Sequence, residues 1–196
     1  MKVAIVDSGG ANLASLAFAF CRLGVRPRLT REAATLARAD RVVLPGVGAA
    51  GAAMGRLSTL RLVPVIRSLT QPVLGICLGM QLLFQHSDED DTPCLGLLPQ
   101  TVRSLIFRPG LPVPHMGWNT LRSITSDPLL GGIAEGSYVY FVHRYAVPVG
   151  EATLAASDYG QPLSAVIRAR NFWGTQFHPE RSGAPGAQIL QNFLRL

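Results

Sequence analysis

An apolar strand turns into a helix at Pro72-Val73-Leu74-Gly75-Ile76-Cys77-Leu78-Gly79-Met80-Gln81. The start of this stretch is apolar throughout, which is typical of a parallel strand covered on both faces. Gly75 and Gly79 flank Cys77 in a Gly-x-nucleophile-x-Gly pattern, with Cys in the place of Ser. Side chains at the two glycine positions would collide in so tight a turn. We therefore expect a strained elbow that raises the Cys77 thiol above the end of the sheet.

The helix after this elbow indicates a chemical role for Cys77. A cysteine at a helix N-terminus is favoured as the thiolate by the helix dipole. The amide of Leu78 is then free to donate a hydrogen bond to an oxyanion. A buried structural thiol is the commoner fate of a lone cysteine, but the paired glycines and the strand-to-helix setting favour a nucleophile. Cys21, on an amphipathic helix, and Cys94, in a loop, are interpreted as incidental.

Strands and helices alternate over the first 85 residues. Apolar runs predict three more strands, at 3–6, 25–29 and 41–44. Pro27 favours an edge position for the second of them. After a turn at Ser8-Gly9-Gly10, Asn12 is expected to cap the first helix and Gly24 to end it. The predicted helices are 13–23, 30–39, 49–69 with interruptions at Gly51, Gly55 and Pro64, and 77–85. This alternation predicts a parallel sheet with right-handed crossovers.

The second half of the chain is predicted to form short strands. Apolar runs separated by turn signals lie at 118–124, 137–145, 152–157, 163–169 and 172–177. Tyr159-Gly160 and Arg170-Asn171 are typical of hairpin turns. A polar, acidic loop is expected at 86–93 and a closing amphipathic helix at 185–196. The predicted fold class is α/β: a mostly parallel, doubly wound sheet with helices on both faces and an antiparallel extension, in one domain spanning residues 1–196.

The base that a cysteine nucleophile needs is expected in Gln176-Phe177-His178-Pro179-Glu180. Residues i and i+2 of an extended strand point the same way, so His178 and Glu180 can face one site. His178 would share the proton of Cys77, and Glu180 would hold the tautomer of His178. The sequence thus predicts a Cys-His-Glu triad whose members are joined by the fold.

The other histidines do not suggest a metal centre. His86 is interpreted as solvated, and His115 and His143, which lie beside strands, as structural. No His-Glu-x-x-His motif and no paired-cysteine spacing is present. We therefore expect neither a metal nor a cofactor.

The composition limits the partners and the compartment. The chain has 196 residues, a formal net charge of +6 and 48% hydrophobic residues. Its basic residues are spaced singly and not interleaved with aromatic residues, which argues against nucleic acid. No apolar run approaches the ~20 residues of a membrane span. Three cysteines without a Cys-x-x-Cys pair favour a reducing cytoplasm.

A glycine-rich loop, Pro45-Gly46-Val47-Gly48, follows the third predicted strand. It has two interpretations, which are compatible. Structurally, it is a turn that needs glycine backbone angles. Functionally, small residues let a backbone N–H approach a substrate, so the loop could supply a second oxyanion donor.

These motifs resemble those of a known family. Cys77-Leu78-Gly79-Met80-Gln81 together with Phe177-His178-Pro179-Glu180 resembles the class I, triad-type glutamine amidotransferases, which have a flavodoxin-like three-layer sandwich fold. Pro114-His115-Met116-Gly117-Trp118-Asn119, Tyr140-Phe141-Val142-His143 and Glu180-Arg181-Ser182-Gly183 narrow the resemblance to glutaminase subunits of imidazole glycerol phosphate synthases. The likeness runs over the whole chain. It implies glutamine hydrolysis that delivers ammonia to a (βα)₈-barrel cyclase subunit in histidine biosynthesis.

The resemblance also implies residue roles. Cys77 would attack the side-chain amide of L-glutamine, His178 would protonate the departing ammonia and then activate water, and Glu180 would orient His178. The implied oxyanion hole comprises Leu78, Val47 and Gly48. The implied glutamine-binding residues are Gly46, Gln81, His143, Arg144 and Tyr145. The implied partner-facing residues are Met116, Trp118 and Asn119.

The chain departs from the family pattern at two positions. Arg144 stands where the family has Ser, and Ser8 where Tyr is common. If backbone atoms hold glutamine at residue 144, the change is tolerable; if the hydroxyl matters, glutamine affinity changes. Three alternatives remain open: a stand-alone cysteine hydrolase of similar fold such as a γ-glutamyl hydrolase, a glutaminase subunit of another biosynthetic synthase, and a non-catalytic binding module with an inert cysteine.

Overall fold

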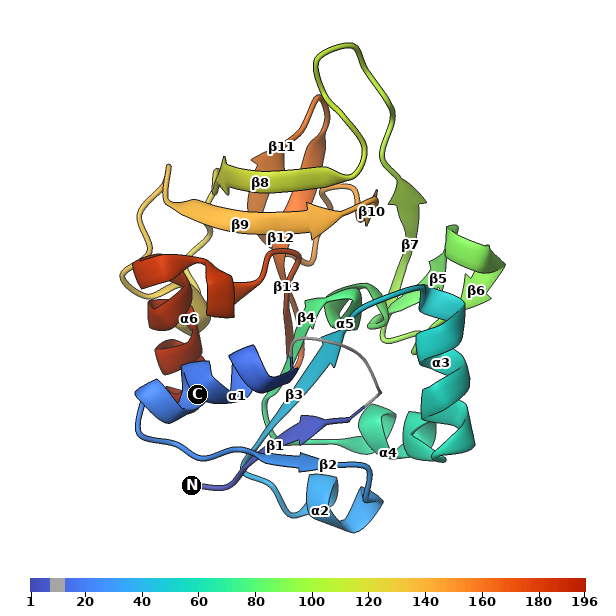
Figure 1. Ribbon diagram of the computed structural model, residues 1–196, viewed down its shortest axis with the longest axis vertical. Helices are drawn as coiled ribbons and strands as arrows, with labels where there is room; N and C mark the ends of the chain where they lie inside the picture. Colours follow the sequence, from blue (N-terminus) through green and yellow to red (C-terminus); the bar gives the residue numbers. More distant parts are fainter. Residues whose placement is uncertain (8–12) are drawn as a thin grey trace.

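The computed structural model describes residues 1–7 and 13–196. Its centre is a seven-stranded sheet in the order β11-β12-β13-β4-β3-β1-β2 (Figure 1). The first four strands of this sheet along the chain are β1 (Val3–Val6), β2 (Arg28–Thr30), β3 (Arg41–Gly46) and β4 (Val73–Cys77), and they run parallel. The parallel α/β arrangement and the edge position of β2 are confirmed. The predicted turn at Ser8-Gly9-Gly10 and the cap at Asn12 lie outside the described residues.

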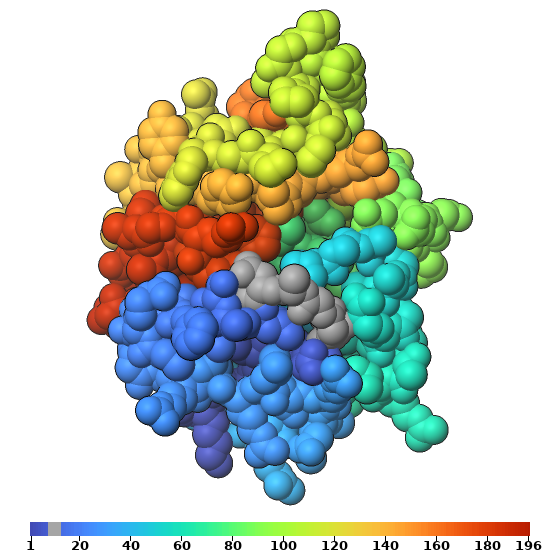
Figure 2. Space-filling view, in the orientation of Figure 1, coloured from blue at the N-terminus to red at the C-terminus, as the bar shows by residue number. Residues whose placement is uncertain are grey.

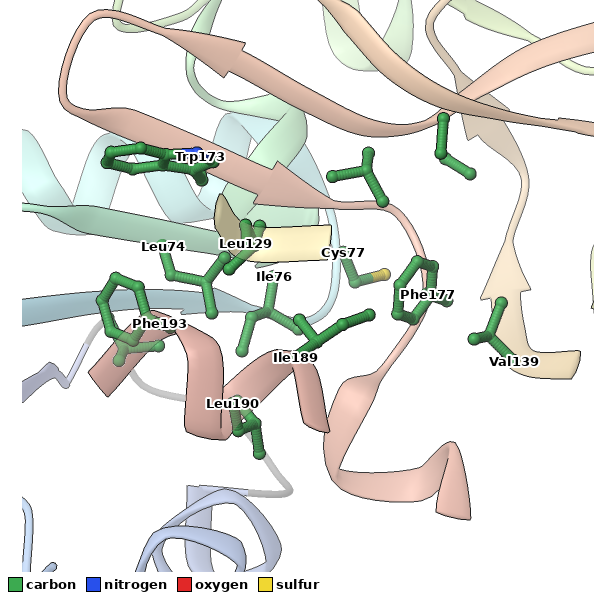
Figure 3. Close-up of a cluster of buried hydrophobic side chains, with 14 of the residues drawn as sticks. Leu74, Ile76, Cys77, Leu129, Val139, Trp173, Phe177, Ile189, Leu190 and Phe193 are labelled. Carbon is green, nitrogen blue, oxygen red and sulfur yellow. The ribbon is translucent and has the colours of Figure 1, made fainter. Parts of the chain in front are cut away.

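Helices cover both faces of this sheet, as predicted. α1 (Leu13–Arg22) and α6 (Gly183–Arg195) pack on one face, whereas α2 (Ala33–Ala37), α3 (Ala50–Thr59) and α4 (Leu62–Ser68) pack on the other. Side chains alternate along each strand, so β1 directs Val3 and Ile5 to the first face and Ala4 and Val6 to the second. Figure 3 shows the first of these two cores, where side chains of α6 lie against Leu74 and Ile76 of β4.

The long helix predicted over 49–69 is two helices, and its break lies elsewhere than expected. Gly51 and Gly55 are inside α3, and Pro64 is inside α4. The break is at Arg61, whose φ of 55° is in the left-handed region. Pro64 is tolerated because it lies in the first turn of α4, where an N–H has no intrahelical partner to lose.

The helix after the elbow is also shorter than predicted. α5 is the single turn Leu78–Gln81, and the chain then enters a second sheet that the sequence analysis missed. Its strands, in the order β10-β7-β5-β6, are β10 (Tyr145–Ala146), β7 (Leu98–Ser104), β5 (Phe84–Ser87) and β6 (Thr92–Pro93). The expected acidic loop contributes β6 and the 3₁₀ turn Glu89–Asp91. Strands β5, β6 and β10 are too short to show a periodic pattern, and distant partners stabilise them.

The antiparallel extension is confirmed for three strands. β11 (Thr153–Asp158), β12 (Pro162–Ala169) and β13 (Phe172–Thr175) pair antiparallel, and β13 joins β4 in parallel. The hairpin turns lie where predicted, with positive φ angles at Gly160 and Arg170. The runs at 118–124 and 137–145 were wrongly assigned to this extension. Their strands, β8 (His115–Thr120) and β9 (Tyr138–His143), form a two-stranded sheet of their own, and an isolated bridge from Arg122 to Ala156 links the first run to β11.

The β8–β9 pair, called the ribbon below, lies beside the end of the main sheet (Figure 1). Its inner face is buried through His115, Phe141 and His143, whereas its outer face leaves Met116 and Trp118 exposed. The loop between β7 and β8 projects beyond the ribbon (Figure 2) and carries the exposed Ile106. The ribbon therefore packs on the rest of the molecule through its inner face alone.

The elbow depends on close backbone packing at Gly79. A Cβ there would overlap the carbonyl oxygen of Leu44, which belongs to the backbone of β3 and cannot move aside. We expect Gly79→Ala to lower the free energy of unfolding by about 3 kcal/mol or more. Gly55→Ala is the matched control: an added Cβ meets nothing within 4 Å, and the helix gains about 0.5–1 kcal/mol. Urea unfolding of both variants tests this, and equal stabilities would contradict it.

Candidate active site

Cys77 lies on the strained elbow that the sequence predicts. It ends β4 and precedes α5 with φ 53° and ψ −113°, a backbone conformation rarely adopted by residues other than glycine. Gly75 and Gly79 permit it, because a Cβ on Gly75 would lie 2.7 Å from the carbonyl oxygen of Gly79. The thiol is at the border of the core, and Figure 3 shows its sulfur directed toward Phe177. A nucleophile held in a strained turn is positioned by the fold and not by its own rotamer.

His178 and Glu180 meet as predicted, but by a different local geometry. His178 has extended backbone angles, and a 3₁₀ turn over Pro179–Arg181 then folds Glu180 back onto the imidazole ring. Glu180 Oε1 lies 2.8 Å from His178 Nδ1. The expected alternation along an extended strand is therefore wrong in detail. Pro179 favours the turn, since its fixed φ suits the first position of a helix.

Ser182, part of the Glu180-Arg181-Ser182-Gly183 motif but given no role from the sequence, holds this turn to the ribbon. Its hydroxyl donates to the carbonyl of His178 over 2.7 Å and accepts from the amide of Tyr140 over 2.9 Å. The amide of His178 in turn donates to the carbonyl of Tyr140 over 3.0 Å. Ser182 is fully buried. The position of the His178 ring thus depends on β9.

The surroundings of His178 favour a protonated imidazole. Burial lowers the pKa of His178, but hydrogen bonds to Cys77 and Glu180 and the charges of both groups raise it to about 10. Since Glu180 takes Nδ1, Nε2 is the ring nitrogen left free to face Cys77 in the cavity that both residues line. The arrangement can therefore hold a proton on Nε2 beside the sulfur, ready for transfer to a leaving group.

A cavity of about 240 Å³ opens beside the triad and brings together the residues predicted to bind substrate. It is lined by Gly46, Val47, Gly48, Cys77, Leu78, Gln81, Glu89, Val142, His143, Arg144, Tyr145 and His178. The glycine-rich loop and the elbow are adjacent because Gly46 pairs with Cys77 across β3 and β4. Leu78 contributes the first amide of α5, a position without an intrahelical acceptor. Backbone donors from two segments can thus converge beside the sulfur.

Three residues of this site were missed from the sequence. Glu89 lines the cavity and accepts from the amide of Ala50 over 2.8 Å; burial raises the pKa of its carboxyl group. The carbonyl oxygen of Val142 lies 3.6 Å from Cys77 Sγ. Gln176 is fully buried, with Nε2 3.9 Å from the same sulfur. Glu89 belongs to an acidic run predicted as a polar loop; Val142 and Gln176 stand in motifs already quoted, but nothing in those motifs assigns them a role of their own.

The predicted partner-facing residues are split between the two faces of the ribbon. Met116 and Trp118 are more than half exposed on the outer face. Asn119 follows Trp118 in β8, so it points to the inner face. Its side chain donates to the carbonyl of Asp158 over 2.8 Å and lies 3.4 Å from His115 Nε2. Asn119 is thus engaged within the chain.

The remaining candidates lie apart from the site. Cys21 is exposed and Cys94 buried, and both are free thiols. His86 is in strand β5 and pairs with Asp91 at 3.0 Å, so it is not simply solvated in a loop. Within 1–7 and 13–196, no cluster of metal-ligating side chains occurs. No helix in these ranges is long and apolar enough to cross a bilayer.

This fold and site define a class of protein. A family model described as "Glutamine amidotransferase class-I" matches residues 4–196, and the chain belongs to that family. The particular relatives are proteins named imidazole glycerol phosphate synthase subunit HisH. The subunit from Xylella fastidiosa (strain Temecula1) is 52% identical over 195 residues, which is 100% of this chain and 98% of that protein. The subunit from Xanthomonas euvesicatoria pv. vesicatoria is 54% identical over 99% of this chain and 97% of its own.

Solved structures support the fold. A protein described as part of a GMP synthase, from Thermoplasma acidophilum, superposes with a TM-score of 0.76 at 21% identity, covering 100% of this chain and 92% of its own. A glutamine amidotransferase from Thermotoga maritima gives 0.68 at 17% identity, with 100% and 81% coverage. At these identities the likeness concerns the fold alone, which is the α/β sandwich predicted from the sequence.

The raised pKa of His178 has a measurable consequence. Its folded value of about 10 exceeds the ~6.5 of an unfolded histidine. Protonated His178 therefore contributes fully to the free energy of unfolding below pH ~6.5, and this contribution is lost as the pH rises to about 10. We expect NMR of the ring to show a protonated His178 at pH ~8, and its pKa to fall in Cys77→Ala, which removes a raising interaction. Half-titration near pH ~6.5 in the unmodified chain would contradict this assignment.

Proposed function

We propose that this chain is the glutaminase subunit of an imidazole glycerol phosphate synthase. It hydrolyses L-glutamine to glutamate and ammonia and delivers the ammonia to a (βα)₈-barrel cyclase for histidine biosynthesis. The observation that carries this proposal is that Cys77 and His178 line one cavity, with Glu180 bonded to His178 from behind, in a chain about half identical to HisH subunits over its full length. The reaction needs no metal or cofactor, since the triad supplies nucleophile, acid and base.

In the proposed reaction, His178 first donates a proton and then accepts one. The Cys77 sulfur attacks the side-chain carbonyl carbon of glutamine, and the resulting oxyanion accepts hydrogen bonds from backbone amides at Leu78 and in the Val47-Gly48 segment. As the C–N bond breaks, Nε2 of His178 donates its proton to the leaving nitrogen, which departs as ammonia and leaves a thioester. Neutral His178 then takes a proton from water, whose oxygen attacks the thioester and releases glutamate. Glu180 keeps Nε2 directed at the reacting atoms throughout.

The charged groups of the cavity suit the amino-acid end of glutamine. Glu89 and Arg144 both line the cavity, and the charge of Arg144 lowers the pKa of Glu89 against the effect of burial. We assign the α-ammonium group of the substrate to Glu89 and its α-carboxylate to Arg144. Gln81 and the backbone from His143 to Tyr145 form the wall between them. On this assignment, Arg144 supplies a cation where the family has Ser.

The outer face of the ribbon is the proposed docking face for the cyclase. Met116, Trp118 and Tyr138 are large apolar side chains that remain exposed there. Trp118 also packs edge-on against Tyr140, whose amide bonds to Ser182 beside the triad. A partner on this face would thus lie next to the strand that anchors His178. We place the chain in the cytoplasm as one domain over residues 1–196, without nucleic-acid or membrane partners.

Cys77→Ala tests the proposed nucleophile in the assembled synthase. Without the sulfur no thioester can form, so glutamine-dependent product formation should fall by at least about 10³-fold. Activity with supplied ammonium salts should stay within about twofold, because the cyclase reaction does not use Cys77. Rates with the two nitrogen sources are compared directly. Loss of both activities would contradict the proposal that Cys77 serves glutamine hydrolysis alone and that the cyclase uses ammonia independently of it.

Alkylation separates the catalytic interpretation from its alternatives. Iodoacetamide should modify Cys77 well before both Cys21 and Cys94, and glutamine should protect Cys77. Equal reactivity of the three thiols would support an inert binding module. High glutaminase turnover by the isolated chain, unaffected by the cyclase, would favour a stand-alone hydrolase. Cys21 is exposed and serves as the reference thiol.

Arg144→Ser and Glu89→Gln test substrate recognition. Each removes one charge from the cavity, so we expect KM for glutamine to rise by about tenfold or more, with kcat changed less. Arg144→Lys keeps the charge and should recover part of the loss. Steady-state glutaminase kinetics of the complex provide the measurement. An unchanged KM in Arg144→Ser would show that backbone atoms alone bind glutamine at this position.

A further inference from the structure

Two buried histidines link the ribbon to the wall of the cavity. His115 Nδ1 lies 3.0 Å from His143 Nε2, and His143 Nδ1 lies 2.9 Å from the carbonyl oxygen of Tyr145. On the other side, His115 Nε2 lies 3.4 Å from Asn119 Nδ2. The mechanism proposed above uses neither imidazole. Their arrangement nevertheless forms one continuous chain of hydrogen bonds across the ribbon.

The ends of this chain assign both tautomers. A carbonyl oxygen can only accept, so the proton of His143 is on Nδ1, and its Nε2 accepts. His115 must then carry its proton on Nδ1 and accept at Nε2. The Asn119 amide is oriented independently, since Nδ2 donates to the carbonyl of Asp158 and Oδ1 accepts from the amide of Thr120. Every N–H of the chain therefore points from Asn119 toward Tyr145.

The surroundings keep both rings neutral and fixed. Burial lowers the pKa of His115 to about 4 and that of His143 to about 3. The His115 ring stacks between Phe141 and Tyr159, with centroid distances of 4.7 and 3.9 Å. Rotation of the ring would break both stacks. The direction of the hydrogen-bond chain and the plane of the His115 ring are thus both fixed.

The receiving carbonyl is part of the substrate wall. The Tyr145 oxygen also accepts from Gln81 Nε2 over 2.7 Å. That Nε2 donates in addition to Gln176 Oε1 over 3.0 Å, and Gln176 Nε2 lies 3.9 Å from Cys77 Sγ. A displaced Tyr145 carbonyl would therefore shift Gln81 and, through Gln176, the surroundings of the nucleophile.

We propose that Asn119, His115 and His143 are positioning residues of the glutaminase, which hold the Tyr145 carbonyl and the Gln81 amide in the geometry that binds glutamine beside Cys77. This inference rests on the proposed function of the site. The three residues touch no reacting atom; they act through Tyr145 and Gln81. The chain starts in β8, the strand whose opposite face exposes Met116 and Trp118, so it joins the proposed docking face to the cavity wall.

His115→Asn and His115→Leu form a matched pair. The two side chains are close in size, and both remove the ring, but the Asn amide nitrogen can replace Nδ1 as donor to His143, whereas Leu cannot. In the assembled synthase, we expect His115→Leu to lower kcat/KM for glutamine by about tenfold, mainly through KM, and His115→Asn to stay within about threefold. Ammonia-dependent activity should be unchanged in both.

Equal losses in the two variants would overturn the proposal, because a packing role alone depends on size and not on the donor. Loss of glutamine-dependent activity only in Cys77→Ala, with both His115 variants normal, would overturn it while leaving the proposed function intact. If the unmodified complex itself lacks glutamine-dependent activity, the proposed function fails first.

Ring ¹⁵N NMR of the unmodified chain provides a test that does not depend on how the variants fold. At pH ~7, both His115 and His143 should be neutral with the proton on Nδ1. The same His143 tautomer is expected in His115→Asn. A proton on Nε2 of either ring, or a charged ring, would contradict the assigned direction of the chain.

Discussion

The close approach of α5 to β3 is the constraint on which the site depends. Gly79 lies so near the carbonyl of Leu44 that no side chain fits between them. This contact draws the first turn of α5 back over the sheet and forces Cys77 into its strained backbone conformation. It also brings Leu78 beside Gly46, the last residue of β3. One backbone contact thus places the sulfur, the first helical amide and the glycine-rich loop at the same edge.

The ribbon supplies the second part of the site. β9 carries the carbonyl of Val142 beside the sulfur and, through Tyr140 and Ser182, sets the height of the His178 ring. The same two strands expose a large apolar face on their other side. Because side chains alternate along a strand, a short two-stranded layer can serve a buried site and an outer surface together. Because the ribbon is separate from the main sheet, one of its faces can border the site while the other remains exposed.

Local signals identified the parts of the chain whose behaviour depends on near neighbours. The buried strands β1, β3 and β4, the elbow glycines and the hairpin turn at Arg170 were all predictable, because each follows from residue type and short spacing. The second sheet was not. Three of its strands, β5, β6 and β10, are short, and β5 pairs with β7 only after the chain has passed through an acidic turn. Glu89 was missed for the same reason, since an acidic run on a surface loop and one folded against the α3 N-terminus look alike in sequence.

The sequence by itself determined the α/β class, the position of Cys77 on its elbow and the His178–Glu180 pair, because strand pattern, glycine spacing and motifs each depend on residues close together in the sequence. Only the tertiary structure decided how these parts meet. It turned Glu180 back onto His178 through a 3₁₀ turn, placed Gln176 beside the sulfur, and joined two apparently structural histidines into a directed chain ending at Tyr145. The longest of these contacts join residues 28 and 99 positions apart, and packing of the whole chain, not local preference, brings them together.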